Sequence, residues 1–554
     1  MQWQPKRSMI AGLVMLVALI VSFTLGAVGG RSLTKTFAAD SPTPQAYDTF
    51  IKNLIAQHKA PFLNKVLASP DEFQIFTQNA LKSAHLGVGK LIGDNNRNVR
   101  VNQDHNPWPK TDVAIAVNPL NPRNIIVATN DLRQLFTRSY YHVSMDGGKT
   151  WSDDVVAESM NPTTSGAYTL VSNPGVAFDR DNHSIIVSLA SNTILDTKTN
   201  YANFDTQISL VKGYAGGLYT DNVTTTIDFL PCNGHASASL QANCQGQLDR
   251  PQVAVDTNPH SPRVNTIYVY YTFFCAGKKQ NNTLKSCTHG NITLPPGSSA
   301  ILESHAAGIG QPFSRPALVS GPRTQAQFAS MVIDSKGVPH VFFDDFSAAP
   351  AIRIYEATLS SNGWTARSKP VATFTYLGLN NPHWHFRDNG AAAPGCTISD
   401  ERAYCAFSAS QIGDGPISRT PDVYLAAIDT SSGESTITRV NDDETGEGRD
   451  HFFPWAAADE KGSVYVGWYD NRRDPAGVKV EYFVGKSSDE GKTFDRQQAV
   501  SDTAFNPCAG FPGCASFGDI NQLAIGSDGV VHAAWADARS GAGLQIYTQA
   551  LKWS

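Results

Sequence analysis

Aspartate and arginine recur together at several places in the C-terminal four fifths of this 554-residue chain. A guanidinium can bind a carboxylate through two parallel hydrogen bonds, aromatic rings can stack on a sugar, and an aspartate can serve as general acid or base. If these groups converge, they could hold an anionic sugar. The recurring groups are Asp131 with Arg133, Asp249 with Arg250, Arg387 with Asp388, Arg449 with Asp450 and His451, Asp470 with Arg472 and Arg473, Asp519, and Asp537 with Arg539, accompanied by Tyr469, Trp384, His383 and His385.

A second interpretation of the same residues is structural. Charges that recur at one place in successive repeats are also what ion pairs between those repeats would require. Trp468 and Trp535 each precede one of these aspartates by two residues, and we expect them to pack between sheets. The sequence leaves both interpretations open.

The elements that must position these groups are hairpins that recur from about Asn98 onward. Each repeat has an apolar run, a turn rich in Asp, Asn and Gly, and a second run rich in β-branched and aromatic residues, which predicts two buried strands. Between the first and last turns, 408 residues in six steps give a period of about 68. The turns are expected at Asn118, Asp179, Asp256, Asp334, Pro394, Asp459 and Gly526.

This period predicts an all-β fold, a β-propeller of four-stranded blades, with seven blades favoured and six possible. The last unit, 519–554, holds only about three strands. Residues Val99 to Gln103 could supply the missing outer strand and close the ring. In such a blade, the loop that enters the innermost strand and the loop that leaves the second strand open on one face. That face would gather the Asp and Arg groups at a single mouth.

Two segments share the pattern S-x-D-x-G-x-T-[W/F]. In such a turn, the carboxylate can accept backbone N–H bonds, glycine can take a positive φ, the hydroxyls can bind local backbone, and the aromatic ring can pack beneath. Two copies in equivalent places of separate repeats indicate a structural turn. The copies are Ser144, Asp146, Gly148, Thr150 and Trp151, and Ser487, Asp489, Gly491, Thr493 and Phe494.

This pattern is identified as the Asp box, or BNR repeat, and residues 98–554 resemble the sialidase-like propellers. Further likenesses are the segments 130–133, 249–256, 468–472 and 535–539. The resemblance implies that the Asp boxes are turns on the rim, away from the active site. It also implies a glycosidase in which three arginines bind the substrate carboxylate, an Asp is general acid or base, and a Tyr paired with a Glu is the nucleophile.

The predicted function is an extracytoplasmic sialidase-like glycoside hydrolase acting on terminal acidic sugars. The alternative is a non-catalytic Asp-box propeller that binds glycan or protein at the cell envelope, which the absence of the family's Phe/Tyr-Arg-Ile-Pro motif favours. The predicted catalytic residues are Asp470, Arg449, Arg472, Arg539 and Tyr469. The predicted substrate-binding residues are Arg250, Arg387, Asp450, His451, Trp384, Asp131 and Arg133.

Composition limits the classes of partner that the chain is expected to bind. With 44 Lys and Arg against 49 Asp and Glu, the net charge is −5, which argues against a nucleic-acid partner. We expect a glycan or glycoconjugate instead. No cofactor is predicted. Residues 442–444 and 344–345 offer oxygen ligands for a structural Ca²⁺ ion, although solvated acidic loops are the favoured explanation.

The N-terminal segment and the cysteines both point to export. Residues 1–30 carry Lys6 and Arg7 ahead of an uncharged apolar stretch, which predicts a signal anchor or a signal peptide. Residues 31–97 are expected to form a linker and short helical stalk. The propeller would then lie outside a single-pass membrane anchor, or be secreted.

The eight cysteines lie as four pairs of close neighbours in the sequence, which predicts disulfides formed in an oxidising compartment. Sequence alone does not establish their pairing. The neighbours are Cys232 and Cys244, Cys275 and Cys287, Cys396 and Cys405, and Cys508 and Cys514.

Overall fold

A computed structural model describes residues 98–553, apart from short gaps. The predicted anchor (1–30) and stalk (31–97) lie outside the described residues, as do Cys232 and Cys244. Within the described part of the chain, no helix is both long and apolar enough to cross a membrane. The gaps are 134–136, 163–166, 169, 197–200, 215–223, 232–245, 276–277, 281–282, 445–447, 495, 512–513, 515 and 542.

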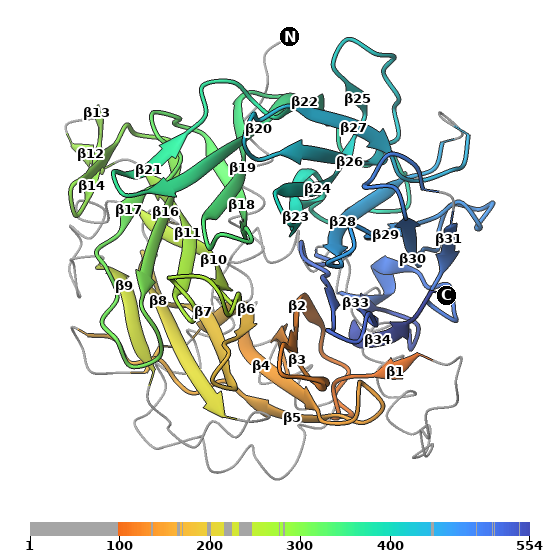
Figure 1. Ribbon diagram of the computed structural model, residues 1–554, viewed down its shortest axis with the longest axis horizontal. Helices are drawn as coiled ribbons and strands as arrows, with labels where there is room; N and C mark the ends of the chain where they lie inside the picture. Colours follow the sequence, from red (N-terminus) through yellow and green to blue (C-terminus); the bar gives the residue numbers. More distant parts are fainter. Residues whose placement is uncertain are drawn as a thin grey trace.

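The described chain forms seven antiparallel sheets arranged around a ring (Figure 1). The predicted seven-bladed propeller is therefore confirmed. Blade 1 contains β2 (Lys110–Asn118), β3 (Asn121–Asp131), β4 (Arg138–Ser144) and β5 (Ser152–Val155). Blade 2 contains β6 (Leu170–Phe178), β7 (His183–Asp196), β8 (Tyr201–Tyr214) and β9 (Thr225–Leu230).

Blades 3 and 4 carry additions to the four-stranded plan. Blade 3 contains β10 (Gln247–Val255), β11 (Ile267–Cys275), β16 (Ser298–Ala306) and β17 (Ala317–Leu318). Its insertion forms two small hairpins, β12 (Lys278–Gln280) with β13 (Thr283–Lys285), and β14 (Cys287–His289) with β15 (Ile292–Leu294). Blade 4 contains β18 (Ala326–Ile333), β19 (Pro339–Ala348), β20 (Ala351–Ser360), β21 (Gly363–Ala366), β22 (Ala372–Thr375) and the borrowed β25 (Gln411–Ile412).

The last three blades return to four strands each. Blade 5 contains β23 (Gly395–Ser399), β24 (Arg402–Ala409), β26 (Asp422–Asp429) and β27 (Ser435–Arg439). Blade 6 contains β28 (His451–Ala458), β29 (Val464–Asp470), β30 (Glu481–Ser487) and β31 (Arg496–Ala499). Blade 7 contains β32 (Leu523–Ile525), β33 (Val531–Asp537), β34 (Gln545–Leu551) and β1 (Val99–Arg100), and the described helices are two 3₁₀ turns, η3 (Asn389–Ala392) and η4 (Pro507–Gly510).

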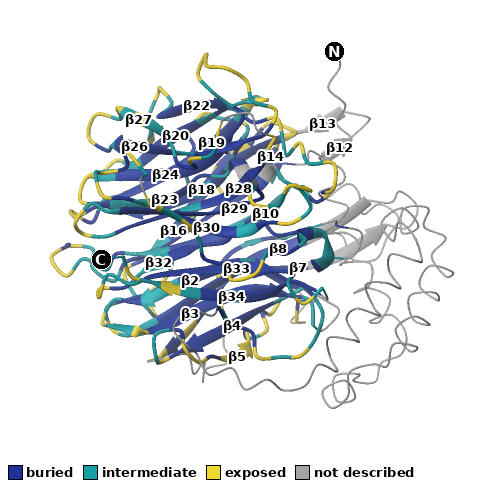
Figure 2. Cartoon of the chain, turned by 90° about the vertical axis from the view of Figure 1, so that its right-hand side faces the viewer, coloured by how far each residue is buried: buried dark blue, intermediate teal, exposed yellow. Residues whose placement is uncertain are grey.

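The second strand of a blade is buried on both faces. In β29, Val466 and Trp468 pack in the core shared with blade 5, whereas Tyr469, of opposite parity, packs in the core shared with blade 7. This double burial explains why such strands read as continuous apolar runs rather than as alternating patterns. Figure 2 shows buried strands stacked through the molecule, with the exposed residues mainly in connecting loops.

The N-terminal strand closes the ring, as the sequence predicted. β1 pairs with β34, and the orange and blue strands lie side by side in Figure 1. Beyond β1, the Val101 N–H donates to Ile546 O at 2.8 Å, and the Ile546 N–H donates to Asn102 Oδ1 at 2.9 Å. Asn102 also donates to Gln545 Oε1 at 2.8 Å. Segments more than 440 residues apart are thus joined in one sheet.

Six of the seven expected turns lie between the first and second strands of their blades. The exception is Pro394: it precedes β23, and the turn of blade 5 is at Asp400 and Glu401. Pro394 followed by Gly395 is a stronger turn signal than Asp400 with Glu401, which explains the misplacement. At Asp334 and Asp459 one carboxylate oxygen accepts two backbone N–H groups across the turn. We call this end of the propeller the turn end. We call the opposite end the bulge end, after the β-bulges in the innermost strands near it.

Three of the predicted neighbouring cysteine pairs are disulfides. Cys275 is bonded to Cys287, Cys396 to Cys405, and Cys508 to Cys514. The second of these joins directly opposed residues of β23 and β24.

We predict that Asn102→Ala destabilises the propeller by about 1–3 kcal/mol, because a buried backbone N–H and the Gln545 amide lose their partner. The measurement is the urea midpoint at unchanged m-value. Gln103→Ala, at an exposed position three residues past β1, is the matched control and should stay within about 0.5 kcal/mol of wild type. Equal midpoints for wild type and Asn102→Ala would contradict the closure argument.

Candidate functional site

Five innermost strands carry the same irregularity. In β2, β6, β10, β18 and β28, two residues lie opposite one residue of the second strand, and the first of the two has a positive φ. Such bulges re-aim side chains and concentrate near functional sites. The bulged residues are Asp112, Asn173, Arg250, Phe328 and Phe453. Each precedes its turn Asp or Asn by six positions, so all five lie at one level near the bulge end.

Charged side chains from distant segments meet at this level. Arg250 from blade 3 and Arg387, from the connection between blades 4 and 5, both donate to Asp519 Oδ2, which precedes blade 7. The Asp519 N–H donates to Asp112 Oδ1 at 3.0 Å, and the Arg250 N–H donates to Asp249 Oδ1 at 2.8 Å. We call these five residues the axial cluster. Their contacts span the ring, because Arg250 and Asp519 belong to blades that are not neighbours.

Burial and the two arginines push the carboxyl pKa values of the axial cluster apart. Burial raises the pKa of Asp249, and attraction to Arg250 offsets only part of that effect. Burial raises the pKa of Asp112 as well, and the neighbouring Asp519 raises it further. At Asp519 burial acts in the same direction, but Arg250 and Arg387 outweigh it and hold the pKa below its usual value. Carboxyl groups separated in this way can act as acid and anion at one pH.

The polar surroundings distinguish the two acids with raised pKa values. Both oxygens of Asp112 accept hydrogen bonds, from the Asp519 N–H, from Thr111 Oγ1 at 2.9 Å and from Asn130 Nδ2 at 2.8 Å. Asp249 Oδ1 also accepts from Asn173 Nδ2 at 3.0 Å, but no hydrogen bond from a described residue reaches Asp249 Oδ2. Asp249 therefore has an oxygen free to carry a proton.

The connection between β22 and β23, residues 376–394, lies over the axial cluster, and we call it the strap. Trp384 and Phe386 are buried, whereas His383 and His385 are exposed. The Phe386 ring lies 5.4 Å from that of Phe517 and packs among the aromatic residues of the core. Side-chain exposure is 34% for Arg387 but only 14% for Arg250 and 3% for Asp519. Arg387 is thus the accessible cation of the axial cluster.

The predicted catalytic residues lie elsewhere. Arg472 donates from its backbone N–H to Asp470 Oδ1 at 2.8 Å and from Nε to Asp470 Oδ2 at 2.7 Å. The same two-point contact joins Arg539 to Asp537 at the end of β33. Arg449 donates to the Asp474 carbonyl at 2.9 Å. The structure does not bring these three arginines together on one group.

Tyr469 and the tryptophans beside these pairs have packing positions. The Tyr469 side chain has no exposed surface, and its hydroxyl donates to Asn521 Oδ1 at 2.7 Å and to Ala536 O at 2.8 Å. Trp468 and Trp535 each donate an indole N–H to the aspartate two residues on, at 2.8 and 2.9 Å. The expectation that both tryptophans pack between sheets is met by their full burial.

Asp131 and Arg133 repeat the contact in blade 1. The Arg133 N–H donates to Asp131 Oδ1 at 2.7 Å, and its guanidinium also pairs with Asp104 and Asp153. One geometry thus recurs in three blades, but each pair lies within its own blade, where the aspartate holds the chain leaving its strand. The contacts between repeats that the structural interpretation expects are those of Arg472 with Asp442 and of Arg539 with Asp502, which reach the connection from the preceding blade.

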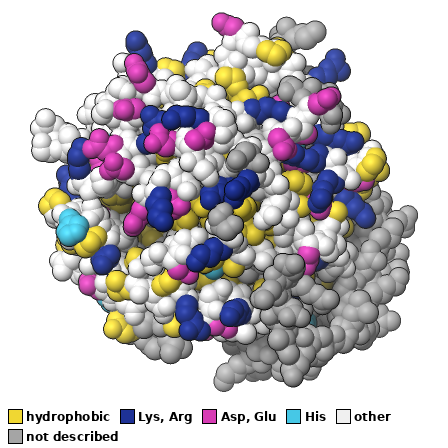
Figure 3. All heavy atoms as spheres, turned by 45° about the vertical axis from the view of Figure 1, so that its right-hand side comes forward, with side chains coloured by type: hydrophobic (Ala, Val, Ile, Leu, Met, Phe, Trp, Pro, Cys, Tyr) yellow, Lys and Arg dark blue, Asp and Glu magenta, His cyan; other side chains and the backbone are white. Residues whose placement is uncertain are grey.

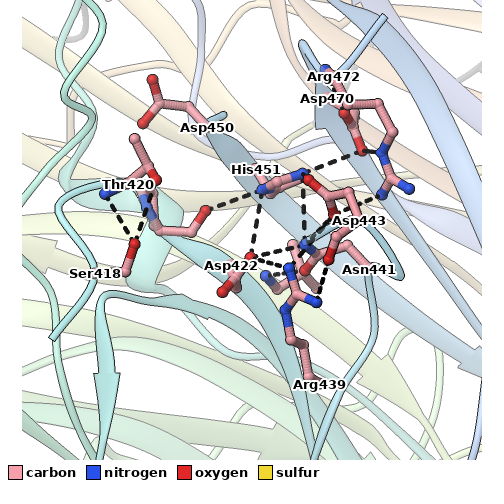
Figure 4. Close-up of polar contacts among 12 residues, drawn as sticks. Ser418, Thr420, Asp422, Arg439, Asn441, Asp443, Asp450, His451, Asp470 and Arg472 are labelled. Atoms are coloured by element: carbon pink, nitrogen blue, oxygen red, sulfur yellow. Dashed lines mark hydrogen bonds and ion pairs between the residues drawn. The ribbon is translucent and has the colours of Figure 1, made fainter. Parts of the chain in front are cut away.

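His451 lies in a buried cage between blades 5 and 6 (Figure 4). Its Nε2 lies 3.1 Å from Asp443 Oδ2 and 3.5 Å from Asp470 Oδ2, and Nδ1 lies 3.1 Å from the Pro421 carbonyl. Burial lowers the pKa of His451, but Asp470 and Asp443 outweigh burial and raise it overall. A protonated imidazole can donate from both nitrogens, which fits these contacts.

The cage also bears on metal binding. Asp422, Asp443 and His451 could each turn one ligand atom toward a common point. However, Arg439 Nη2 already lies 2.8 Å from Asp422 Oδ1, and Arg472 Nη2 lies 3.4 Å from Asp443 Oδ1. The arginines neutralise the carboxylates that a cation would need.

The second predicted calcium site contains a carboxyl whose pKa is strongly raised. Asp344 is fully buried, and burial together with the adjacent Asp345 raises its pKa well above the usual value. That shift favours the neutral acid, which is a poor ligand for Ca²⁺. A structural Ca²⁺ ion stays a prediction.

The two S-x-D-x-G-x-T turns lie at the turn end, opposite the axial cluster. Asp146 accepts from Ser144 Oγ at 2.8 Å and from Thr150 Oγ1 at 2.6 Å, and the Gly148 N–H donates to Ser144 Oγ. Gly148 has φ +85°, and Trp151 is buried beneath the turn. The second copy has the same contacts among Ser487, Asp489, Gly491 and Thr493, and Phe494 packs against the core.

Charges of both signs mix on the surface drawn in Figure 3, where Lys and Arg side chains lie among Asp and Glu side chains. Two further predicted binding residues hold the strap in place, Asp450 from outside it and Trp384 from within it. Asp450 Oδ1 accepts from the Asn380 N–H at 3.1 Å, and Trp384 donates its indole N–H to the Val478 carbonyl at 3.1 Å.

Sequence reasoning missed Asp112, Asn173, Phe328 and Phe453. Their signal is positional: each stands six residues before a turn Asp or Asn, as Arg250 does. Aligning the repeats on their turns would have found this column of residues.

No known protein family matches the sequence, and no curated protein matches it. Solved structures with a similar trace include a protein of unknown function from Dyadobacter fermentans, 12% identical over 71% of this chain and 98% of that chain, with a TM-score of 0.39. The Hadza microbial sialidase Hz136 is 12% identical over 75% and 76%, with a TM-score of 0.37. A GH93 α-L-arabinofuranosidase of Fusarium graminearum is 10% identical over 83% and 98%, with a TM-score of 0.39. Scores this low do not decide an activity.

We predict that His451→Gln destabilises the propeller at pH 6 by about 2 kcal/mol, because buried Asp443 and Asp470 lose a charged hydrogen-bond partner while keeping their contacts to Arg472. The raised pKa means that the stability from His451 is present below the unfolded value of about 6.5 and is lost as pH rises through the folded value. Urea unfolding between pH 6 and 9 should therefore show a slope in wild type that His451→Gln lacks. The exposed control His383→Gln should keep the wild-type slope. Loss of the slope in His383→Gln would contradict the assignment of the pH dependence to His451.

Proposed function

We propose that the axial cluster is the acid–base centre of a glycoside hydrolase acting on acidic sugars. The observation that supports this most directly is the pair Asp249 and Asp519, whose pKa values are shifted in opposite directions while both contact Arg250. A neutral acid and a carboxylate in one site are the groups that glycosidic bond hydrolysis requires.

The chemistry follows from the two protonation states. Asp249 donates its proton to the glycosidic oxygen as the C–O bond breaks. Asp519 stabilises the positive charge at the anomeric carbon and accepts a proton from the attacking water, so that the products are the free sugar and the released alcohol. Arg250 donates to Asp519 Oδ2 and lowers the pKa of Asp519, which keeps this carboxyl ionised. No described tyrosine reaches the axial cluster, so a tyrosine nucleophile has no support.

Acidic sugars are favoured because Arg387 offers a guanidinium that is 34% exposed and has donors beyond the one that binds Asp519. We place the activity outside the cytoplasm, since the three disulfides are typical of oxidising compartments. The second candidate is a non-catalytic glycan-binding propeller. It is favoured by one observation: Arg250 and Arg387 are both already ion-paired with Asp519.

We predict that the full chain releases 4-methylumbelliferone from glycosides of sialic acid or glucuronic acid faster than from neutral glycosides. Asp249→Asn and Asp519→Asn should each lower kcat/KM by about 10²–10⁴-fold, the usual contribution of an acid or base. Asp414→Asn, an exposed aspartate on the loop after β25, is the matched control.

Two other outcomes are informative. Binding of an acidic oligosaccharide without turnover, weakened by Arg387→Ala, would replace the hydrolase with the binding propeller. A folded protein with neither binding nor turnover would overturn both proposals.

We also predict an acidic optimum for kcat/KM. The rate requires Asp519 ionised and Asp249 protonated, so it should fall at low pH as Asp519 takes a proton and at higher pH as Asp249 loses one. The upper limb should lie above the ordinary Asp pKa of about 3.9. A rate that rises steadily to pH 8 would exclude Asp249 as the acid.

A further inference from the structure

The axial cluster poses an access problem. Asp519 and Arg250 are largely enclosed, and the strap that carries Phe386 and Arg387 lies over them. The Gly390 backbone in the strap approaches Asp519 so closely that a Cβ there would lie 2.6 Å from Oδ1. A ligand cannot pass between the strap and Asp519 in this conformation.

Polar contacts and aromatic burial together hold the strap. Asn381 donates to the Gly477 carbonyl at 2.6 Å and Trp384 donates to the Val478 carbonyl at 3.1 Å, both in the loop between β29 and β30 of blade 6. Also in blade 6, Asp450 Oδ1 accepts from the Asn380 N–H. Arg387 pairs with Asp519. Trp384 and Phe386 pack in the hydrophobic core, and apart from the short η3 turn the strap has no secondary structure of its own, so its lifting must break these bonds and expose the two rings.

We infer that the strap is a gate that must lift from the bulge end before a ligand reaches Asp249 and Asp519, and that Trp384 and Asp450 are the positioning residues that hold it shut. The identity of the ligand that the gate admits rests on the proposed function. The gate itself is testable without any substrate.

Asp450 makes the gate respond to pH. Burial raises its pKa to about 6, and Asp388 in the strap adds to that rise, whereas the Asn380 N–H and His451 act against it. The charge of Asp450 also contributes to raising the pKa of Tyr376 in the strap. A raised pKa in the closed state means that closure is favoured below about 3.9 and that this advantage is lost as pH rises through about 6. The gate therefore opens more readily above pH 6.

The test is hydrogen exchange of the full chain, followed by mass spectrometry on peptides covering 376–394 and 516–523. Trp384→Phe keeps the ring and removes the N–H, and we expect about fivefold faster exchange in both peptides, as loss of one hydrogen bond predicts. Trp364→Phe removes an indole bond to Glu303 elsewhere in the fold and is the matched control, with no change expected in these peptides.

The second arm is pH. After correction for intrinsic exchange, opening in wild type should increase between pH 4 and 7, and Asp450→Asn should abolish that increase while leaving global unfolding cooperative. Unchanged exchange in Trp384→Phe, or a pH response that persists in Asp450→Asn, would overturn the gate. Confirmed gating with no turnover of any glycoside would leave the gate standing and remove only the hydrolase.

Discussion

The structure depends on one long-range pairing, the joining of the N-terminal strand to the last blade. Blades 1 to 6 each contain at least four strands of their own, with β25 added to blade 4, but blade 7 obtains its outer strand from residues that precede blade 1. Arg250 and Asp519 come from blades that are not neighbours, so their contact requires the ring to be closed. The site is therefore a property of the closed ring and of no single blade. This also explains why the polar contacts near the seam are numerous: Lys110, although fully buried, donates to Asp104 and to two carbonyl groups.

Local patterns predicted the fold well because each blade is built from local hairpins. The period, the blade number and the closing strand were all readable from turn residues and apolar runs. Blade 5 was placed imperfectly, since Pro394 and Gly395 give a stronger turn signal than the turn that forms at Asp400 and Glu401. The site was harder to predict. Asp470, Arg472 and Arg539 have the residue types of a binding site, but each pair is formed within a few residues along the chain, which is the signature of a strand end that caps itself.

The axial residues differ from those capping pairs in the origin of their partners. Arg387 comes from an irregular connection whose path no periodicity describes, and Asp112 is marked only by its distance from a turn. Buried charges in the capping pairs and in the His451 cage are matched by opposite charges, so that removing one partner would leave the other buried without compensation. In the axial cluster three carboxyl groups share two arginines, and this imbalance is what separates the pKa values there.

The repeated bulge has a consequence for how such a protein can change. Because the strand pairing on either side of each bulge is regular, the side chain at that position contributes little to the sheet. Asp, Asn, Arg and Phe already occupy equivalent sites in different blades of this one chain. The ring thus presents a different side chain from each of these blades at one level of its mouth. The half-buried ones, Asp112, Asn173 and Arg250, are the places where single replacements could create new ligand preferences, whereas Phe328 and Phe453 are buried and help to hold the scaffold.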